Sequence, residues 1–269
     1  MCRKHYFFWV QLFIALLCAY QSFGMDASLR QQLITAIEKD AVQEIASLVD
    51  EKKVDVNAII DDDFGVTLLL HAASLGAVKV GELLLERGAS KDTMTKCKQS
   101  CMSIACQGNK LDFIKMLRAR GVSLDATEKD KRSPLEFAIV ADAVETVDFL
   151  LEHNVSRAPL EIVVPRQGDV RMPSGRVELL IEEYKPRFSL LHFAVFVNAL
   201  RVCNLLCTKY RFDPNEKIPF RKLTNEVVQL TPNDIAVMSS NWPIAQILKD
   251  NGANAKSHHA LMLLYFSKE

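Results

Sequence analysis

The sequence lacks a net charge and the short motifs of common catalytic sites. Its 269 residues contain 33 Lys plus Arg and 33 Asp plus Glu, so the formal net charge is zero. Charge therefore gives no support to a function that depends on nucleic acid or on an anionic membrane. The chain also has no glycine-rich phosphate loop, no H-E-x-x-H zinc motif and no G-x-S-x-G nucleophile motif. We expect no catalytic residue, no cofactor and no nucleic-acid partner.

The cysteines lack the spacing of a disulfide framework or a zinc site. Two of the seven, Cys2 and Cys18, lie within the first 24 residues. The other five are Cys97, Cys101, Cys106, Cys203 and Cys207. None of them forms the C-x-x-C pair typical of zinc sites, and no histidine or aspartate completes a ligand set beside the last two. We therefore expect no metal site, and we expect the last four to be small buried apolar residues.

The first 24 residues have the layout of a signal peptide. Arg3 and Lys4 precede an apolar run from Tyr6 to Tyr20, and the small residues Ser22 and Gly24 stand at the −3 and −1 positions of a cleavage site. This order predicts a signal peptide over residues 1–24, and hence a protein that is secreted or periplasmic.

Two other interpretations of this leader stay open. The apolar run is shorter than the ~20 residues that cross a bilayer comfortably, so a retained anchor is the weaker alternative and we expect no stable membrane insertion after cleavage. Alternatively, translation starts at Met25 and the protein is cytoplasmic. The five cysteines after the leader favour this second possibility, because an oxidising compartment normally selects paired cysteines.

An internal repeat organises the rest of the chain. The segment from Gly65 to Ser90 recurs with Thr67 as its origin, and two of the steps between origins are 33 residues long. The origins are Gln31, Thr67, Ser100, Ser133, Ser189 and Thr231. Five residues after them stand Ala36, Ala72, Ala105, Ala138, Ala194 and Ala236. Seventeen residues after them stand Leu48, Leu84, Leu117, Leu150, Leu206 and Leu248. Gly88, Gly121 and Gly252 stand twenty-one residues after their origins, where Asn154 and Tyr210 are departures.

This pattern resembles the ankyrin-repeat family. The resemblance implies an all-α solenoid over residues 25–269, built of antiparallel helix pairs joined by β-turn fingers. The slots fit that fold, because a small alanine lets two helices approach closely and the leucine rows need a neighbouring repeat on each side. In this respect the chain resembles the ankyrin-repeat proteins that bacteria export, which implies a host-directed or envelope protein of a bacterium.

The family's T-P-L-H tetrapeptide is degraded in this chain. Only Ser189 with His192 keeps both the hydroxyl and the histidine of the family's capping hydrogen bonds. We interpret this pair as structural rather than as a nucleophile and base, because no orienting carboxylate accompanies it. The array is therefore predicted to be less stable per repeat than a consensus one.

Two steps between origins are longer than the period. The extra residues fall at 214–228, which predicts an enlarged finger, and at 157–188. We interpret 157–188 either as a degenerate seventh repeat or as a loop insertion. After the last repeat, Leu261, Leu264 and Tyr265 recur at helical spacing, which predicts a C-terminal cap over 256–269.

The ankyrin resemblance implies a protein–protein interaction module that binds its partner on the concave surface of fingers and first helices. Charge along the fingers changes from acidic to mixed to basic, and Phe220 is an aromatic residue in a polar finger. The candidate partner-binding residues are Asp61, Asp62, Asp63, Lys129, Lys131, Arg132, Lys217, Phe220, Arg221 and Lys222. Two alternatives are an intracellular scaffold or adaptor that starts at Met25 and an enzyme that uses the 157–188 insertion. We expect a monomer and a protein partner whose identity the sequence does not reveal.

Overall fold

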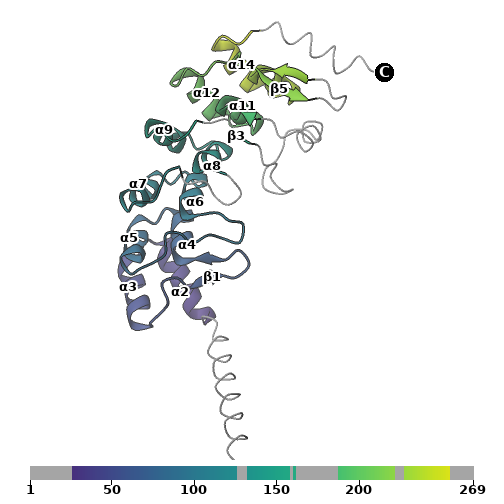
Figure 1. Cartoon of the computed structure of the whole chain (residues 1–269). Helices are drawn as coiled ribbons and strands as arrows, with labels where there is room; N and C mark the ends of the chain where they lie inside the picture. The colour runs from purple at the N-terminus through teal and green to yellow at the C-terminus, as the bar shows by residue number, and fades with distance from the viewer. Residues whose placement is uncertain (1–25, 126–131, 158–159, 162–186, 222–226, 255–269) are drawn as a thin grey trace, which may run out of the picture.

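The computed structural model describes residues 26–125, 132–157, 160–161, 187–221 and 227–254. The predicted leader at 1–24 and the predicted cap at 256–269 lie outside these residues. Within them, twelve helices form six consecutive pairs (Figure 1). The pairs are α2 (Ala27–Glu38) with α3 (Val42–Glu51), α4 (Leu68–Leu75) with α5 (Val78–Glu86), α6 (Cys101–Gln107) with α7 (Leu111–Ala119), α8 (Pro134–Val140) with α9 (Val144–Glu152), α11 (Leu190–Phe196) with α12 (Leu200–Thr208), and α13 (Pro232–Met238) with α14 (Trp242–Asp250).

The pairs stack into a two-layered solenoid, which confirms the predicted fold class. Figure 1 shows the second helices, from α3 to α14, along one side and the first helices with the fingers along the other. The first helices are called inner and the second helices outer below. Each helix contacts its counterpart in the next pair, and α8 and α11 contact each other less than the other inner helices do.

The predicted helix contacts carry the core. All six alanines of the repeat are fully buried, and five of the six leucines are also at 0% exposure. The sixth leucine, Leu48, is only half-buried because it belongs to the first pair, which no other described helix pair precedes. Four cysteines are buried within the stack as expected, whereas Cys97 is exposed. Core packing therefore follows the sequence period.

Four of the six repeat origins cap the N-terminus of an inner helix through a side-chain hydroxyl group. The side chain of Thr67 accepts a hydrogen bond from the Leu70 amide, and Ser100 does the same for Ser103. Ser133 and Thr231 form complete capping boxes with an acidic residue three positions later. The degraded T-P-L-H sequence thus keeps a hydroxyl N-cap at α4, α6, α8 and α13, where it satisfies an otherwise unpaired backbone amide.

Ser189 uses its hydroxyl differently. Its Oγ lies 2.7 Å from Nδ1 of the buried His192, whose Nε2 lies 3.3 Å from the carbonyl oxygen of Leu230 in the next repeat. Burial lowers the pKa of His192, so the neutral ring donates through Nε2 and accepts at Nδ1. The pair joins two repeats and has the structural role that was expected of it.

The fingers are short antiparallel hairpins on the inner side. The first consists of β1 (Ile59–Asp61) and β2 (Val66–Thr67). Another hairpin, β5 (Ile218–Arg221) with β6 (Val227–Leu230), overlaps the segment 214–228 predicted as an enlarged finger and ends two residues beyond it. Between them, β3 (Leu160–Glu161) pairs with β4 (Arg187–Phe188), so that the chain on either side of residues 162–186 meets at one finger position.

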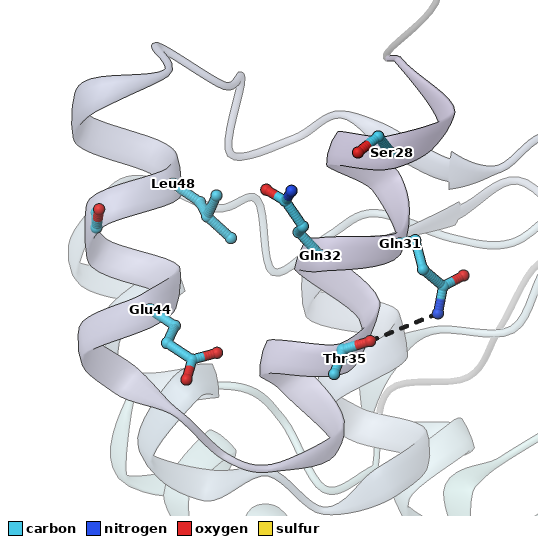
Figure 2. Close-up of a pocket in the computed structure, with 7 residues that line it drawn as sticks. Ser28, Gln31, Gln32, Thr35, Glu44 and Leu48 are labelled. Carbon is cyan, nitrogen blue, oxygen red and sulfur yellow. Dashed lines mark hydrogen bonds between the residues drawn. The ribbon is translucent and has the colours of Figure 1, made fainter.

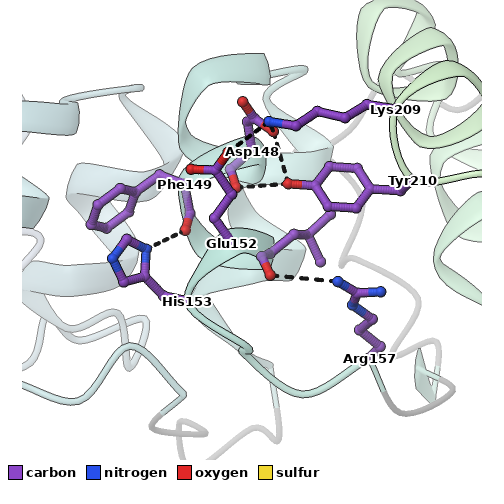
Figure 3. Close-up of polar contacts among 8 residues, drawn as sticks. Asp148, Phe149, Glu152, His153, Arg157, Lys209 and Tyr210 are labelled. Carbon is purple, nitrogen blue, oxygen red and sulfur yellow. Dashed lines mark hydrogen bonds and ion pairs between the residues drawn. The ribbon is translucent and has the colours of Figure 1, made fainter.

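The helix pairs on either side of this segment stack directly on each other. Asp142, in the turn between α8 and α9, accepts hydrogen bonds from the Arg201 and Val202 amides at the start of α12. Near the far end of these helices, Lys209 Nζ lies 2.5 Å from Asp148 and 2.7 Å from Glu152 (Figure 3). The outer helices α9 and α12 are in contact. The pairing of β3 with β4 places both ends of the inserted segment on the finger side of the stack. Residues 162–186 themselves lie outside the described part, so a degenerate repeat and a loop both stay predictions for them.

Candidate partner-binding surface

The first finger, residues 59–67, presents an aromatic residue among three aspartates. The Asp61 side chain folds the tip by accepting hydrogen bonds from the Asp63 and Phe64 amides, at 2.9 and 3.2 Å. Gly65 then takes the left-handed conformation that closes the turn, with φ of 68°. In this geometry the Phe64 side chain is 58% exposed and Ile59, at the start of β1, is 46% exposed.

A lysine from the following repeat holds the finger tip in place. The Lys96 amide donates to the Phe64 carbonyl oxygen at 2.8 Å, and its ammonium group donates to the Asp62 carbonyl oxygen at 2.5 Å. The exposed tip therefore rests on the neighbouring repeat, and its side chains are presented from a fixed backbone.

A pocket of about 500 Å³ opens between this finger and the inner helices α2 and α4. Ile34, Ile60 and Val66 supply its apolar lining. Its polar lining consists of Arg30, Asp61, Asp62, Asp63 and His71. The predicted acidic residues therefore surround one cavity, and they do so together with two side chains from the inner helices.

The polar atoms of this pocket are only partly paired. The Arg30 guanidinium lies 3.3 Å from the Asp62 carboxylate, but Arg30 Nε and His71 Nε2 are buried without a hydrogen-bond partner among the described residues. Burial lowers the pKa of His71, although Glu38 and Asp61 oppose this effect, so its ring is neutral at neutral pH. The pocket thus offers hydrogen-bonding capacity that the described residues leave unused.

The structure does not gather the other predicted binding residues at this pocket. The Arg132 guanidinium lies 4.6 Å from the ring centre of Phe137, and Lys217 is exposed ahead of β5. Phe220 and Arg221 belong to β5, but their side chains are not described. Lys129, Lys131 and Lys222 lie outside the described residues. A binding role for these residues stays a prediction.

Sequence reasoning missed Phe64 and His71. Phe64 stands between Asp63 and Gly65 in an otherwise polar turn, which is the signal that drew attention to Phe220. His71 follows the slot of the family's histidine, which predicts only that it packs beside the finger; its unpaired nitrogen depends on how the finger folds over α4.

A second pocket, of about 610 Å³, lies between α2 and α3 on the N-terminal end face of the stack (Figure 2). Figure 2 shows Gln32 of α2 and Leu48 of α3 pointing toward each other. The lining also includes Ser28, Gln31 and Thr35 of α2 and Glu44 of α3. In the later repeats the slots of Gln32 and Glu44 are buried by the preceding repeat. The polar side chains here therefore suit a terminal face in contact with water.

The described residues contain no group of three or more His, Cys, Asp or Glu side chains arranged to hold a metal ion. In the same part of the chain, no helix is both long and apolar enough to cross a membrane.

Comparisons with known proteins agree with this architecture. Residues 83–158 match the family model described as ankyrin repeats (3 copies). The crystal structure of the human ASB11 ankyrin repeat domain is similar over 83% of this chain and 85% of that chain, with a TM-score of 0.57 and 20% sequence identity. Residues 83–158 thus match ankyrin repeats, and the chain has the ankyrin-repeat fold; ankyrin repeats indicate a protein–protein interaction module.

A curated relative is the glycerophosphocholine phosphodiesterase GDE1 of Candida albicans. It is 26% identical over 143 residues, which are 53% of this chain but only 12% of the relative. The likeness spans such a small part of that protein that its activity is not transferred to this chain.

Proposed function

We propose that the chain binds its partner protein through the first finger and the pocket beside it. The observation that carries this proposal is the joint exposure of Phe64 and Ile59 on a finger that also bears the exposed Asp62 and Asp63. Aromatic side chains are enriched among the residues that dominate binding energy, and fingers border the concave surface of a solenoid.

The pocket favours a basic segment of the partner. Its apolar lining matches the aliphatic stem of a lysine or arginine, and its carboxylates match the cationic head group. Because the lowered pKa keeps His71 neutral, the imidazole does not repel that cation. A partner segment that places a basic side chain in the pocket and an apolar side chain against Phe64 fits these features best.

Photo-crosslinking tests this surface directly, because the covalent adduct itself carries the partner. A photoreactive amino acid is placed at Phe64 in one chain and at Asp112 on the outer helix α7 in another, where the aspartate side chain is 85% exposed. In the native cell, we expect a discrete adduct from position 64 and none from position 112. Equal labelling from both positions, or labelling from position 112 alone, would contradict the proposal.

Once the adduct identifies the partner, point variants measure the contribution of the finger. The double variant Phe64→Ala with Asp63→Asn should lower affinity by about tenfold or more, which is the scale of losing a binding hot spot. The control variant Asp112→Asn removes one exposed carboxylate from the outer side and should leave affinity unchanged.

We further propose that the basic finger at 214–228 orients the partner at the other end of the concave surface. Charges of opposite sign at two ends of a binding surface set orientation and association rate. The variant Phe220→Ala with Arg221→Ala should then weaken binding without changing the melting temperature measured by circular dichroism.

Export and the absence of catalysis also belong to this proposal. The signal-peptide layout of residues 1–24 supports export, and N-terminal sequencing of the protein from its native cell would reveal cleavage after Gly24 or translation from Met25. The interaction fold supports binding rather than catalysis. Hydrolysis of glycerophosphocholine by the purified chain would overturn that part.

A further inference from the structure

The two end faces of the solenoid differ in polarity. The slots six and fourteen residues after each origin are covered by the repeat that follows. In the first five repeats all ten residues at these slots are buried, and they are Ile37, Ala73, Cys106, Ile139, Val195, Ile45, Gly81, Ile114, Val147 and Cys203. In the sixth repeat, Val237 and Ala245 are only half-buried. The last described repeat therefore ends in an apolar face that no described residue covers.

Trp242 makes this face larger. It stands eleven residues after its origin, at the start of α14, and is 59% exposed. The equivalent residues of the earlier repeats are half-buried apolar side chains, namely Val42, Val78, Leu111, Val144 and Leu200. We call Val237, Trp242 and Ala245 the C-terminal face.

The first repeat shows how an end face looks when it is suited to water. The slots one and thirteen residues after each origin face the preceding repeat. In the first repeat they hold the exposed polar residues Gln32 and Glu44. In the other repeats they hold buried residues, which are Leu68, Cys101, Pro134, Leu190, Pro232, Val80, Phe113, Thr146, Val202 and Ile244. A terminal repeat needs a polar outer surface for solubility, and the C-terminal face lacks one.

We propose that residues 255–269 of the same chain pack across the C-terminal face as a helix. This segment starts at the correct place, because the Asn254 amide is fixed to Asn215 Oδ1 at 2.8 Å. Its 15 residues, if helical, span about 22 Å, more than the roughly 14 Å of the nine-residue α14, at 1.5 Å per residue.

The sequence of the segment matches this role. Leu261, Leu264 and Tyr265 fall on one side of a helix, and Leu263 falls on the opposite side. A tethered segment also competes well with a second copy of the chain, because its effective concentration at the face is high. The capping helix completes the solenoid and is independent of which partner the fingers bind.

Trp242 provides a direct measurement. The chain has two tryptophans, and the other is Trp9 in the leader, so the full chain with Trp9→Phe reports on Trp242 alone. We expect blue-shifted fluorescence that is poorly quenched by acrylamide. Adding Leu261→Ser with Leu264→Ser should shift the emission to the red and raise the quenching constant. The control Leu263→Ser makes the same chemical change on the opposite side of the helix and should leave both values unchanged.

A second measurement does not depend on the serine variants being well folded. A photoreactive amino acid at position 242 of the full chain should form crosslinks to peptides from residues 255–269 of the same chain, as identified by mass spectrometry. The proposal is wrong if Trp242 is equally accessible in all three fluorescence variants, or if no crosslink reaches this segment. Crosslinks that join two chains, together with protection that increases with protein concentration, would assign the face to a second copy and would also overturn it.

Discussion

Two junctions of the solenoid join helix pairs in the same way across different lengths of chain. From the second repeat to the third, the origins Thr67 and Ser100 are 33 residues apart, and from the fourth to the fifth, Ser133 and Ser189 are 56 residues apart. At the first junction Arg120 pairs with Glu86 at 3.0 Å, and at the second Lys209 pairs with Glu152 at 2.7 Å. These partners occupy identical slots, twenty and nineteen residues after their origins, so the insertion leaves the register of the outer helices intact.

The turn between the two helices of a repeat distinguishes the junctions. At the shorter one this turn contains Gly76, and the stem of Lys110 packs so closely that an added Cβ would lie 2.9 Å from its Cδ. At the longer one the turn contains Asp142, whose carboxylate caps α12.

Outer-helix contacts add to this cap at the longer junction. The Tyr210 hydroxyl donates to the Asp148 carboxylate at 2.8 Å, and the Arg157 guanidinium lies 5.4 Å from the Tyr210 ring centre (Figure 3). Arg201 pairs with Glu145 at 3.4 Å on the same side. Polar contacts on the outer side thus stabilise a junction at which the inner helices α8 and α11 have few contacts with each other.

The largest expected effect concerns the core of the two junctions. Leu117 and Leu206 occupy the same slot and are both at 0% exposure. If the repeats around the insertion are stacked as directly as the others, Leu206→Ala and Leu117→Ala should each lower the free energy of unfolding by about 3 kcal/mol, the usual loss for a buried leucine. Urea titration followed by circular dichroism measures both. A much smaller loss for Leu206→Ala would mean that the longer junction is not packed like the shorter one.

The next effect concerns the cap at the longer junction. Asp142 has φ of 51° and accepts hydrogen bonds from two amides of α12. Asp142→Ala should lower the free energy of unfolding by roughly 2 kcal/mol. It removes the cap, and alanine adopts the left-handed conformation less readily than aspartate does. Asp142→Asn keeps an acceptor and tolerates that conformation, so it should retain most of the stability. Equal losses for the two variants in urea titrations would argue against a capping role.

Sequence was sufficient for the stack because its signals are periodic. The alanine and leucine slots depend only on spacing, and the same spacing places left-handed turns nine residues after every origin. The residues at these turns are Asp40, Gly76, Asn109, Asp142, Asn198 and Ser240. The ion pairs between slots nineteen and twenty, among them Glu86 with Arg120, were also available as a periodic signal, although only the structure drew attention to them.

The candidate site was less predictable because it departs from the period. The three aspartates stood out as a charge cluster, but their position over a pocket depends on how the Asp61 side chain folds the finger tip. The contribution of His71 depends on burial of one ring nitrogen, which no spacing encodes. Contacts between residues of different repeats outside the common slots, such as Tyr210 with Asp148, need the three-dimensional stack for the same reason.

A smaller effect is expected from the ion-pair cluster at the longer junction. Burial raises the pKa of Asp148, but the hydrogen bonds from Lys209 and Tyr210 outweigh it and hold that pKa below its usual value. Asp148→Asn should lower the free energy of unfolding by about 1 kcal/mol, since it weakens a partly buried network. The control Asp112→Asn breaks an exposed pair with Lys115 at 3.7 Å and should cost less than about 0.5 kcal/mol. If both variants behave alike in thermal melts, the cluster adds nothing beyond an ordinary surface pair.

The smallest expected effect is a pH dependence confined to the longer junction. Burial and the hydrogen bond to Asp148 raise the pKa of the Tyr210 phenol to about 12 from 10.0. Because the folded-state pKa is the higher one, the stability contributed by the neutral phenol is complete below pH 10.0 and is lost as pH rises through about 12. Ultraviolet difference titration should therefore detect one late-ionising tyrosine that disappears in Tyr210→Phe. In Asp148→Asn, which removes the neighbouring negative charge, the same phenol should ionise at a lower pH. Titration of Tyr210 at its ordinary pKa in the unmodified chain would mean that the contact between α9 and α12 is not maintained in solution.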